Sequence, residues 1–182
     1  MSGSGARRRD FEMTKYVALL RAINVGGTGK LPMAELKAMC TDAGFTDVQT
    51  YIASGNVVFE SKLSPARVKS VLEARLHAYA GKPTGVALRT ASEMAAILKA
   101  NPFSKLSPTF TVAIFLDDRP PADALDHAAG VADEKMRLGR REIFIHYPSG
   151  QGRSKLRIPA AKTGTARNMN TVAALVEMAS KR

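Results

Sequence analysis

The sequence predicts an α+β protein that consists of two packed subdomains. Strand-like and helix-like segments follow one another in the order βαββαβ along the first half, which is the ferredoxin-like pattern. A βαββα order follows, so the second subdomain is expected to be a related unit. The first strand of each half, residues 16–20 and 110–116, is apolar on both faces. Since a lone ferredoxin-like sheet leaves one face open, we expect the other subdomain to cover it.

The length of the chain fits this division. Its 182 residues, of which 45% are apolar, suffice for two units of about 90 residues each. Residues 1–12 are rich in serine, glycine and arginine and are expected to form a disordered leader. Residues 13–103 are assigned to the ferredoxin-like subdomain and residues 104–182 to the second α+β subdomain, with residues 104–108 as the linker.

Each element of the first subdomain has a local signal. β-Branched and aromatic residues indicate strands, which we place at residues 16–20, 48–54, 57–61 and 84–89. Apolar stripes at helical spacing indicate helices, which we place at residues 32–43, 65–80 and 91–100. Gly44 and Gly81 are expected to end the first two helices. Gly55 and Asn56 are expected to form a two-residue hairpin turn.

The second subdomain is expected to start with the apolar strand of residues 110–116 and to end with a helix of about residues 165–180. Between them, the sequence predicts a helix opening at residue 121 or 122 and running to about residue 129, a hairpin of residues 134–138 and 142–147, and an irregular basic segment of residues 153–162.

The charge balance favours anionic partners. The chain has 27 basic and 16 acidic residues. Without the first ten residues, which hold three arginines and one aspartate, 24 basic and 15 acidic residues leave a net charge of +9. The basic excess therefore belongs to the folded body and suits nucleic acid, a nucleotide or another small anionic ligand. The alternative is a soluble protein whose surface happens to be basic.

Several classes of protein and site are excluded. The single cysteine, Cys40, leaves neither an internal disulfide framework nor a cysteine-based zinc site, and it fits a reducing, cytoplasmic location. No segment approaches the roughly 20 apolar residues of a transmembrane helix, so no membrane partner is expected. The histidines His77, His127 and His146 lack metal-ligand spacing. We expect no metal and no cofactor, and the sequence indicates no particular oligomeric state.

Polar residues interrupt two apolar segments at their ends. Arg21 and Asn24 follow the first strand, Ser54 ends the second strand, and Asn56 lies between the second and third strands. The first two strands of a split βαβ unit are parallel, so their carboxyl ends lie at the same edge of the sheet. Residues 21–27 are therefore expected beside residues 54–56. A charge or an amide at such a position needs a partner or a crevice.

A glycine-rich segment follows Arg21 and includes Gly26, Gly27 and Lys30. It is not a P-loop, because Asn24 stands where the motif needs its first glycine and Leu31 stands where it needs serine or threonine. Backbone amides ahead of a helix can still bind an anion. The alternative is a simple flexible turn.

A second polar segment, residues 163–171, precedes the last helix. The structural alternative is helix capping, in which Thr165 or Asn168 accepts a backbone N–H. Capping the helix requires only one of these side chains, so it does not account for Arg167 and Asn170. These two side chains could hold a phosphate, a carboxylate or an acidic side chain. The sequence leaves open whether this segment joins the edge at residues 21 and 54 or only caps the helix.

The ordered motifs resemble a bacterial family known as domain of unknown function 1697. They are residues 16–27, 31–36, 44–45, 50–51, 54–59 and 165–172. The resemblance implies two α+β subdomains, the first ferredoxin-like, and no established activity. The family has glycine where this chain has Ala22, and tryptophan where it has Met169. The second difference argues against base stacking at that position.

The leading hypothesis is a cytoplasmic protein that binds an anionic ligand, nucleic acid or a nucleotide, at the edge formed by residues 21–27 and 54–56. One alternative is an enzyme of unknown reaction in which Arg21 and Arg167 stabilise negative charge. In the other alternative, the motifs are purely structural and form a buried hydrogen-bond network. The candidate ligand-binding residues are Arg21, Asn24, Gly26, Gly27, Lys30, Ser54, Asn56, Arg167, Asn168 and Asn170.

Overall fold

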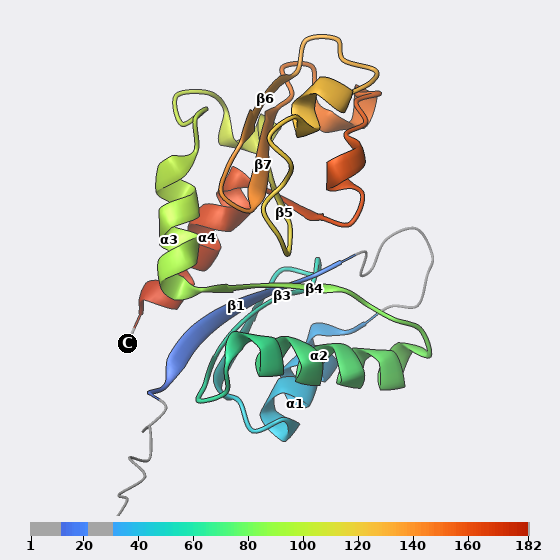
Figure 1. Ribbon diagram of the computed structural model, residues 1–182. Coiled ribbons are helices and arrows are strands. Elements are labelled where there is room, and N and C mark those ends of the chain that lie inside the picture. The colour runs from blue at the N-terminus through green and yellow to red at the C-terminus, as the bar shows by residue number, and fades with distance from the viewer. Residues whose placement is uncertain (1–11, 22–30, 182) are drawn as a thin grey trace, which may run out of the picture.

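The computed structural model describes residues 12–21 and 31–181. It is a mixed α+β structure with two four-stranded antiparallel sheets, and Figure 1 shows how its elements are arranged. The predicted leader lies outside the described residues except for Glu12. The division of the chain at residues 103 and 104 stays a prediction.

The first sheet has the strand order β2-β3-β1-β4, so β1 and β3 lie in its centre. Its strands are β1 (Thr14–Leu20), β2 (Thr46–Tyr51), β3 (Asn56–Ser61) and β4 (Val86–Thr90). Its helices are α1 (Met33–Asp42), α2 (Pro65–Ala80) and α3 (Ala91–Ala100). Gly81 adopts a positive φ of 72° and ends α2, which suits a residue without a side chain.

The second sheet repeats this order as β6-β7-β5-β8. Its strands are β5 (Thr111–Phe115), β6 (Lys135–Leu138), β7 (Glu142–His146) and β8 (Thr165–Asn168), and α4 (Met169–Ser180) follows the last of them. In place of the first unit's α1 and α2, this unit has the short 3₁₀ turns η2 (Ala124–His127), η3 (Gln151–Arg153) and η4 (Pro159–Ala161).

Helices α3 and α4 lie between the two sheets, whereas α1 and α2 cover the outer face of the first sheet (Figure 1). The central core combines Val17 and Leu19 of β1, Met94 of α3, Phe115 of β5 and Leu175 of α4, all at most 1% exposed. Both faces of β1 are thus buried, which explains why its apolar residues do not alternate with polar ones. The expectation that the second unit helps to cover the first sheet is confirmed.

Three predicted elements differ from the structure. The turn between β2 and β3 spans residues 52–55, and Asn56 is the first residue of β3, because its side chain closes the turn by binding Tyr51. The helix expected from residue 121 or 122 is only η2. Residues 165–168, expected as the start of the last helix, form β8, since the ladder with β5 supplies hydrogen bonds that local signals do not reveal.

Cys40 is expected to resist thiol reagents in the folded protein. It lies fully buried on α1, and burial raises the pKa of its thiol from 9.0 to about 12. At pH 8 the thiolate fraction is then lower by about a thousandfold, and only the thiolate reacts. Reaction with a chromogenic disulfide should be slow in buffer and rapid in guanidinium chloride. Equal rates in the two solvents would contradict this placement.

Candidate functional site

Arg167 lies where β8 of the second unit meets the end of β1. Its Nη2 atom donates hydrogen bonds of 2.9 Å to the carbonyl oxygens of Leu20 and Ser54. Its Nε atom donates one of 2.6 Å to Oδ1 of Asn56, and Nη1 donates to the carbonyl oxygen of Ala166. The segment before the last helix therefore joins the predicted edge through one residue, which answers the question that the sequence left open.

Asn56 is fully buried and organises the β2–β3 turn as well as Arg167. Its Nδ2 atom donates to the carbonyl oxygen of Tyr51 at 3.0 Å and to Oγ of Ser54 at 2.8 Å. Its Oδ1 atom accepts from Arg167. A side-chain amide can donate and accept at once, whereas an ionised carboxylate can only accept. The need to bind Tyr51 explains why a neutral side chain faces the guanidinium.

The charge of Arg167 has no carboxylate partner within the parts of the chain that the structure describes. The residue is half-buried, and burial lowers its pKa from the ordinary value of arginine to about 10. The guanidinium is therefore still protonated at pH 7. Burying a charge costs free energy unless hydrogen bonds or an opposite charge compensate for the lost hydration. For Arg167, the compensating groups are neutral hydrogen-bond acceptors.

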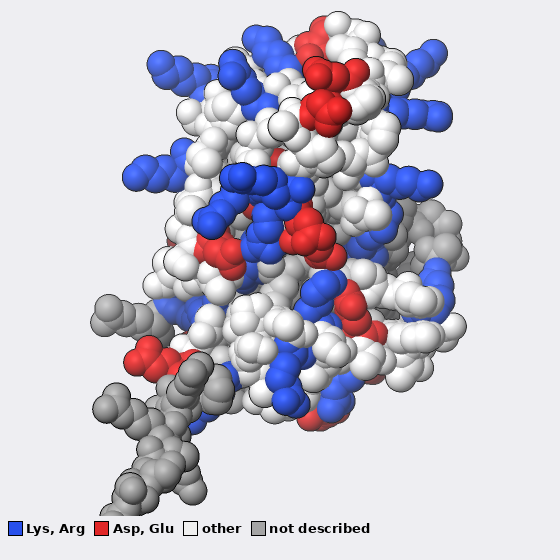
Figure 2. Space-filling view, in the orientation of Figure 1, with Lys and Arg blue, Asp and Glu red and all other residues white. Residues whose placement is uncertain are grey.

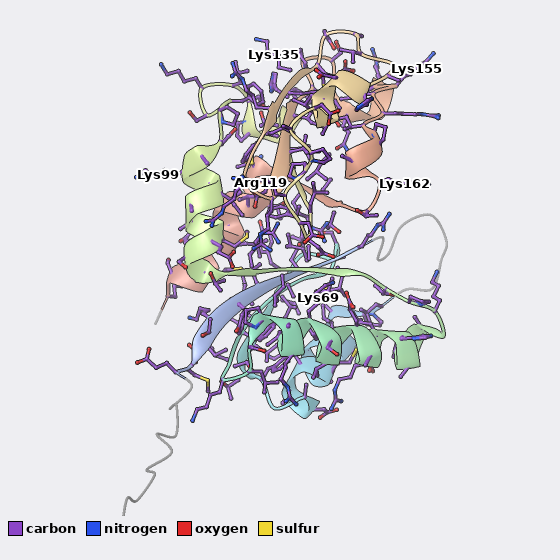
Figure 3. The ribbon with its side chains drawn as sticks, viewed as in Figure 1. Lys69, Lys99, Arg119, Lys135, Lys155 and Lys162 are labelled. Atoms are coloured by element: carbon purple, nitrogen blue, oxygen red, sulfur yellow. The ribbon has the colours of Figure 1, made fainter. Side chains whose placement is uncertain are left out.

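Arg21 follows β1 directly and is exposed. Its main-chain N–H donates to the carbonyl oxygen of Gly85 at 2.9 Å, and its guanidinium donates to the carbonyl oxygen of Lys162. Figure 3 shows Lys162 at the side of the second unit that borders the first. Arg21, Lys162 and Arg167 thus bring three positively charged residues to the junction between the two units.

The remaining predicted site residues are placed elsewhere or lie outside the structure. Asn168 caps α4, because its Oδ1 atom accepts from the N–H of Thr171 at 2.9 Å. Asn170 is exposed and donates to Oγ1 of Thr109 at 3.1 Å. The predicted residues that lie outside the described parts of the chain are Asn24, Gly26, Gly27 and Lys30.

A second arginine, Arg89, makes matching contacts between the two units and is not among the site residues predicted from the sequence. It is 1% exposed. Its Nε atom donates to Oε1 of Glu142 at 3.3 Å, and Nη2 donates to the carbonyl oxygens of Leu116 at 2.7 Å and Arg141 at 3.1 Å. Nη1 donates to the carbonyl oxygen of Leu88. Burial lowers the pKa of Arg89.

Arg89 and Arg167 occupy equivalent positions in the two units. Arg89 lies opposite Val17 of β1, and Arg167 lies opposite Ala113 of β5. Each is followed by the residue that caps the next helix, α3 or α4. Each guanidinium crosses to the other unit and binds the carbonyl oxygen at or just beyond the end of its central strand. The two units are therefore joined by a reciprocal pair of arginine contacts.

The acceptor of the Nε atom is the main difference between these two contacts. Glu142 and Asn56 are equivalent, since they are the first residues of β7 and β3 and lie opposite Phe115 and Leu19. Arg89 thus faces a carboxylate, whereas the other guanidinium faces an amide. The positive charge of Arg89 is therefore balanced by Glu142. The contact of Arg167 with Asn56 keeps a net positive charge.

A local signal for Arg89 does exist in the sequence. An arginine directly precedes a helix-capping residue twice, as Arg89-Thr90 and as Arg167-Asn168. Comparing these two dipeptides could have identified Arg89 as the counterpart of Arg167. The partner Glu142 could not be found in this way, because only the pairing of strands distant in the sequence places it.

These features define a class of α+β protein in which two four-stranded antiparallel sheets are joined by reciprocal arginine contacts. A family model described as a protein of unknown function (DUF1697) matches residues 13–144, so the chain belongs to this family. The structure of the conserved bacterial protein SP0830 from Streptococcus pneumoniae is similar, with a TM-score of 0.78 and 27% identity. That match covers 93% of this chain and 100% of the other. A search of curated proteins found no match.

Two classes of feature are absent from the described residues. None of the helices there is long and apolar enough to span a membrane. No group of three or more histidine, cysteine, aspartate or glutamate side chains in residues 12–21 and 31–181 is placed to hold a metal ion. His146 is buried and its Nδ1 atom lies 2.9 Å from Oγ1 of Thr111.

Proposed function

We propose that this protein binds a small anionic ligand, such as a nucleotide, at the junction of its ferredoxin-like first unit with β8, at Arg21, Ser54, Asn56 and Arg167. One observation carries the proposal: Arg167 is half-buried and faces an amide, whereas its equivalent faces a carboxylate. An anion at this junction would supply the missing negative charge. The net charge of +9 outside the first ten residues also favours an anion.

The arrangement suits anion binding because the guanidinium is already oriented. Three acceptors on the first unit hold Arg167, namely the carbonyl oxygens of Leu20 and Ser54 and the amide oxygen of Asn56. A preorganised donor loses little conformational entropy when a ligand arrives. Arg21, exposed at the same end of β1, is the residue that a ligand can reach from solvent.

On one face of the molecule, the distribution of surface charge favours a small ligand over a long nucleic acid. On the face shown in Figure 2, basic and acidic side chains are intermixed and form no continuous basic stripe. Nucleic-acid binding by the phosphate backbone needs basic side chains along an extended footprint. A nucleotide needs only a local cluster.

Titration with a fluorescent nucleotide, labelled single-stranded RNA and labelled duplex DNA at low salt, followed by anisotropy, tests the proposal. We expect the nucleotide to bind and Arg21→Gln to weaken its binding at least fivefold, because the variant removes one exposed charge at the site. Arg137→Gln is the matched control. It removes the same charge from β6, which lies at the opposite edge of the second sheet from β8, and should change affinity less than twofold.

Equal weakening by both variants would show that binding follows net charge alone and would reject the site. Absence of binding to all three probes would reject the function. A preference for RNA or DNA with the same Arg21 dependence would keep the site but change the class of ligand. Titrating each variant at two salt concentrations separates a site contact from general attraction.

The structural alternative is favoured by a specific observation, the four hydrogen bonds that Arg167 already makes to protein acceptors. In that interpretation the network only joins the two units. Asn56→Ala would then lower the melting temperature while affinity for every probe stays unchanged. Under the proposed function, Asn56→Ala alters both stability and nucleotide affinity, because it releases the guanidinium from its orientation.

A further inference from the structure

A cavity of about 260 Å³ lies between α3 and the turn that joins β6 to β7. Ala96, Ile97 and Ala100 line it from the helix, and Gly139 and Phe144 line it from the hairpin. Ile97 and Phe144 are buried and form an apolar floor. The volume is just below the range of roughly 300–1,000 Å³ that is usual for small-molecule sites.

Small residues keep this cavity open. A Cβ atom on Gly139 would lie 2.8 Å from Cε2 of Phe144, so a side chain there would collide with the cavity wall. In the other unit, the position on α4 that corresponds to Ala100 is Met178, counted from the first residue of each helix. Met178 packs against the central core together with Tyr51. Helix α3 therefore has an alanine at the position where α4 has a large side chain that packs against the core.

Charged side chains line the cavity above its apolar floor. Arg140 is exposed and has no ion pair within residues 12–21 and 31–181. Arg141 pairs with Glu93 at 2.5 Å and donates to the carbonyl oxygen of Asp117 at 3.3 Å. The fourth charged lining residue, Glu142, is neutralised by its buried pair with Arg89. The charged lining therefore retains one uncompensated positive charge, on Arg140.

We propose that this cavity binds a small monocarboxylate with an apolar body. The apolar part would occupy the space between Ala96, Ala100 and Phe144, and the carboxylate would pair with Arg140. A single negative charge balances the one uncompensated guanidinium. A dianionic phosphate is less suitable, since Arg140 would balance only one of its two negative charges and the other charged lining residues are already paired. The proposal is independent of the anion site at Arg167, because the two use different residues and different elements.

Hexanoate, hexanamide and acetate are suitable probes, each titrated into ¹⁵N-labelled full-length protein and followed by amide chemical shifts. We expect hexanoate to shift the amides of residues 96–100 and 139–142 in a saturable manner. Hexanamide keeps the apolar body and lacks the charge, and acetate keeps the charge and lacks most of the body. Each is expected to bind at least tenfold more weakly than hexanoate.

Two variants with matched controls test the geometry. Ala96→Phe fills the cavity and should weaken hexanoate binding at least tenfold, whereas Ala95→Phe places the same side chain at an exposed position of α3 outside the lining and should not. Arg140→Gln should weaken binding at least fivefold, and Arg137→Gln should change it less than twofold. Arg21→Gln should leave hexanoate affinity unchanged, so failure here is distinguishable from failure of the anion site.

Several results would overturn the proposal. Equal affinities for hexanoate and hexanamide would show that the charge of Arg140 is not used. Shifts confined to other parts of the chain, or full binding by Ala96→Phe, would show that the cavity is not the site. Saturable shifts with an acidic peptide but with none of the small probes would assign the surface to a protein partner instead.

Discussion

Replacing Arg89 with methionine is expected to lower the free energy of unfolding by about 3–5 kcal/mol. The variant keeps much of the apolar side-chain volume but removes four hydrogen bonds and the partner of Glu142. Glu142 is itself 4% exposed, so its carboxylate would remain buried without an opposite charge. Urea denaturation followed by circular dichroism measures the loss, provided that the m-value stays unchanged.

The double variant Arg89→Met with Glu142→Gln separates charge from hydrogen bonding. If the unpaired carboxylate is the main cost, the second substitution should recover a large part of the lost stability. Arg137→Gln, at an exposed position of β6, should change stability by less than about 0.5 kcal/mol. A loss below 1 kcal/mol for Arg89→Met would contradict the buried pair as a principal contact between the units.

Replacing Arg167 with methionine is expected to cost less, about 1.5–3 kcal/mol. The variant also removes four hydrogen bonds. It leaves only neutral acceptors without their donor, namely the carbonyl oxygens of Leu20, Ser54 and Ala166 and the amide oxygen of Asn56. These groups are cheaper to leave unsatisfied than a buried carboxylate. The same denaturation experiment ranks the two arginine variants directly.

Lysine provides the control at this position. Arg167→Lys keeps the positive charge but cannot reproduce the planar fork that reaches Leu20, Ser54 and Asn56 together. We expect it to recover little of the stability that Arg167→Met loses. If Arg167→Met were as costly as Arg89→Met, the difference between an amide and a carboxylate partner would not matter. The argument for an unbalanced charge at this junction would then fail.

The difference between these two junctions connects stability with the proposed function. Arg89 is balanced internally and contributes to the association of the two units. Arg167 makes the equivalent contacts but keeps a net charge, because Asn56 must also donate to Tyr51. The fixed orientation of the Arg167 guanidinium, on which the proposed site depends, is thus a consequence of the local hydrogen bonding of the β2–β3 turn.

Much of the first unit can be predicted from local signals. The apolar strand at residues 16–20, the helix predicted at residues 32–43 and the glycine that ends α2 all follow from residue type and spacing, and the structure confirms them. The arrangement of β1 and β3 as central neighbours follows from the order of the elements. For the candidate site, the sequence indicated the residues at the ends of the strands but not their hydrogen-bond partners.

The sequence by itself determined the α+β class, the βαββαβ order of elements in the first unit, the position of Arg21 after an apolar strand and that of Arg167 in a polar segment before the last helix. Only the tertiary structure decided that residues 165–168 form a strand, that Arg89 pairs with Glu142 and that Arg167 binds Asn56. The reason is physical. Helix caps and apolar periodicity depend on neighbours a few residues away. The two arginine contacts instead join residues 53 and 111 positions apart in the sequence, which become neighbours only when the two sheets pack.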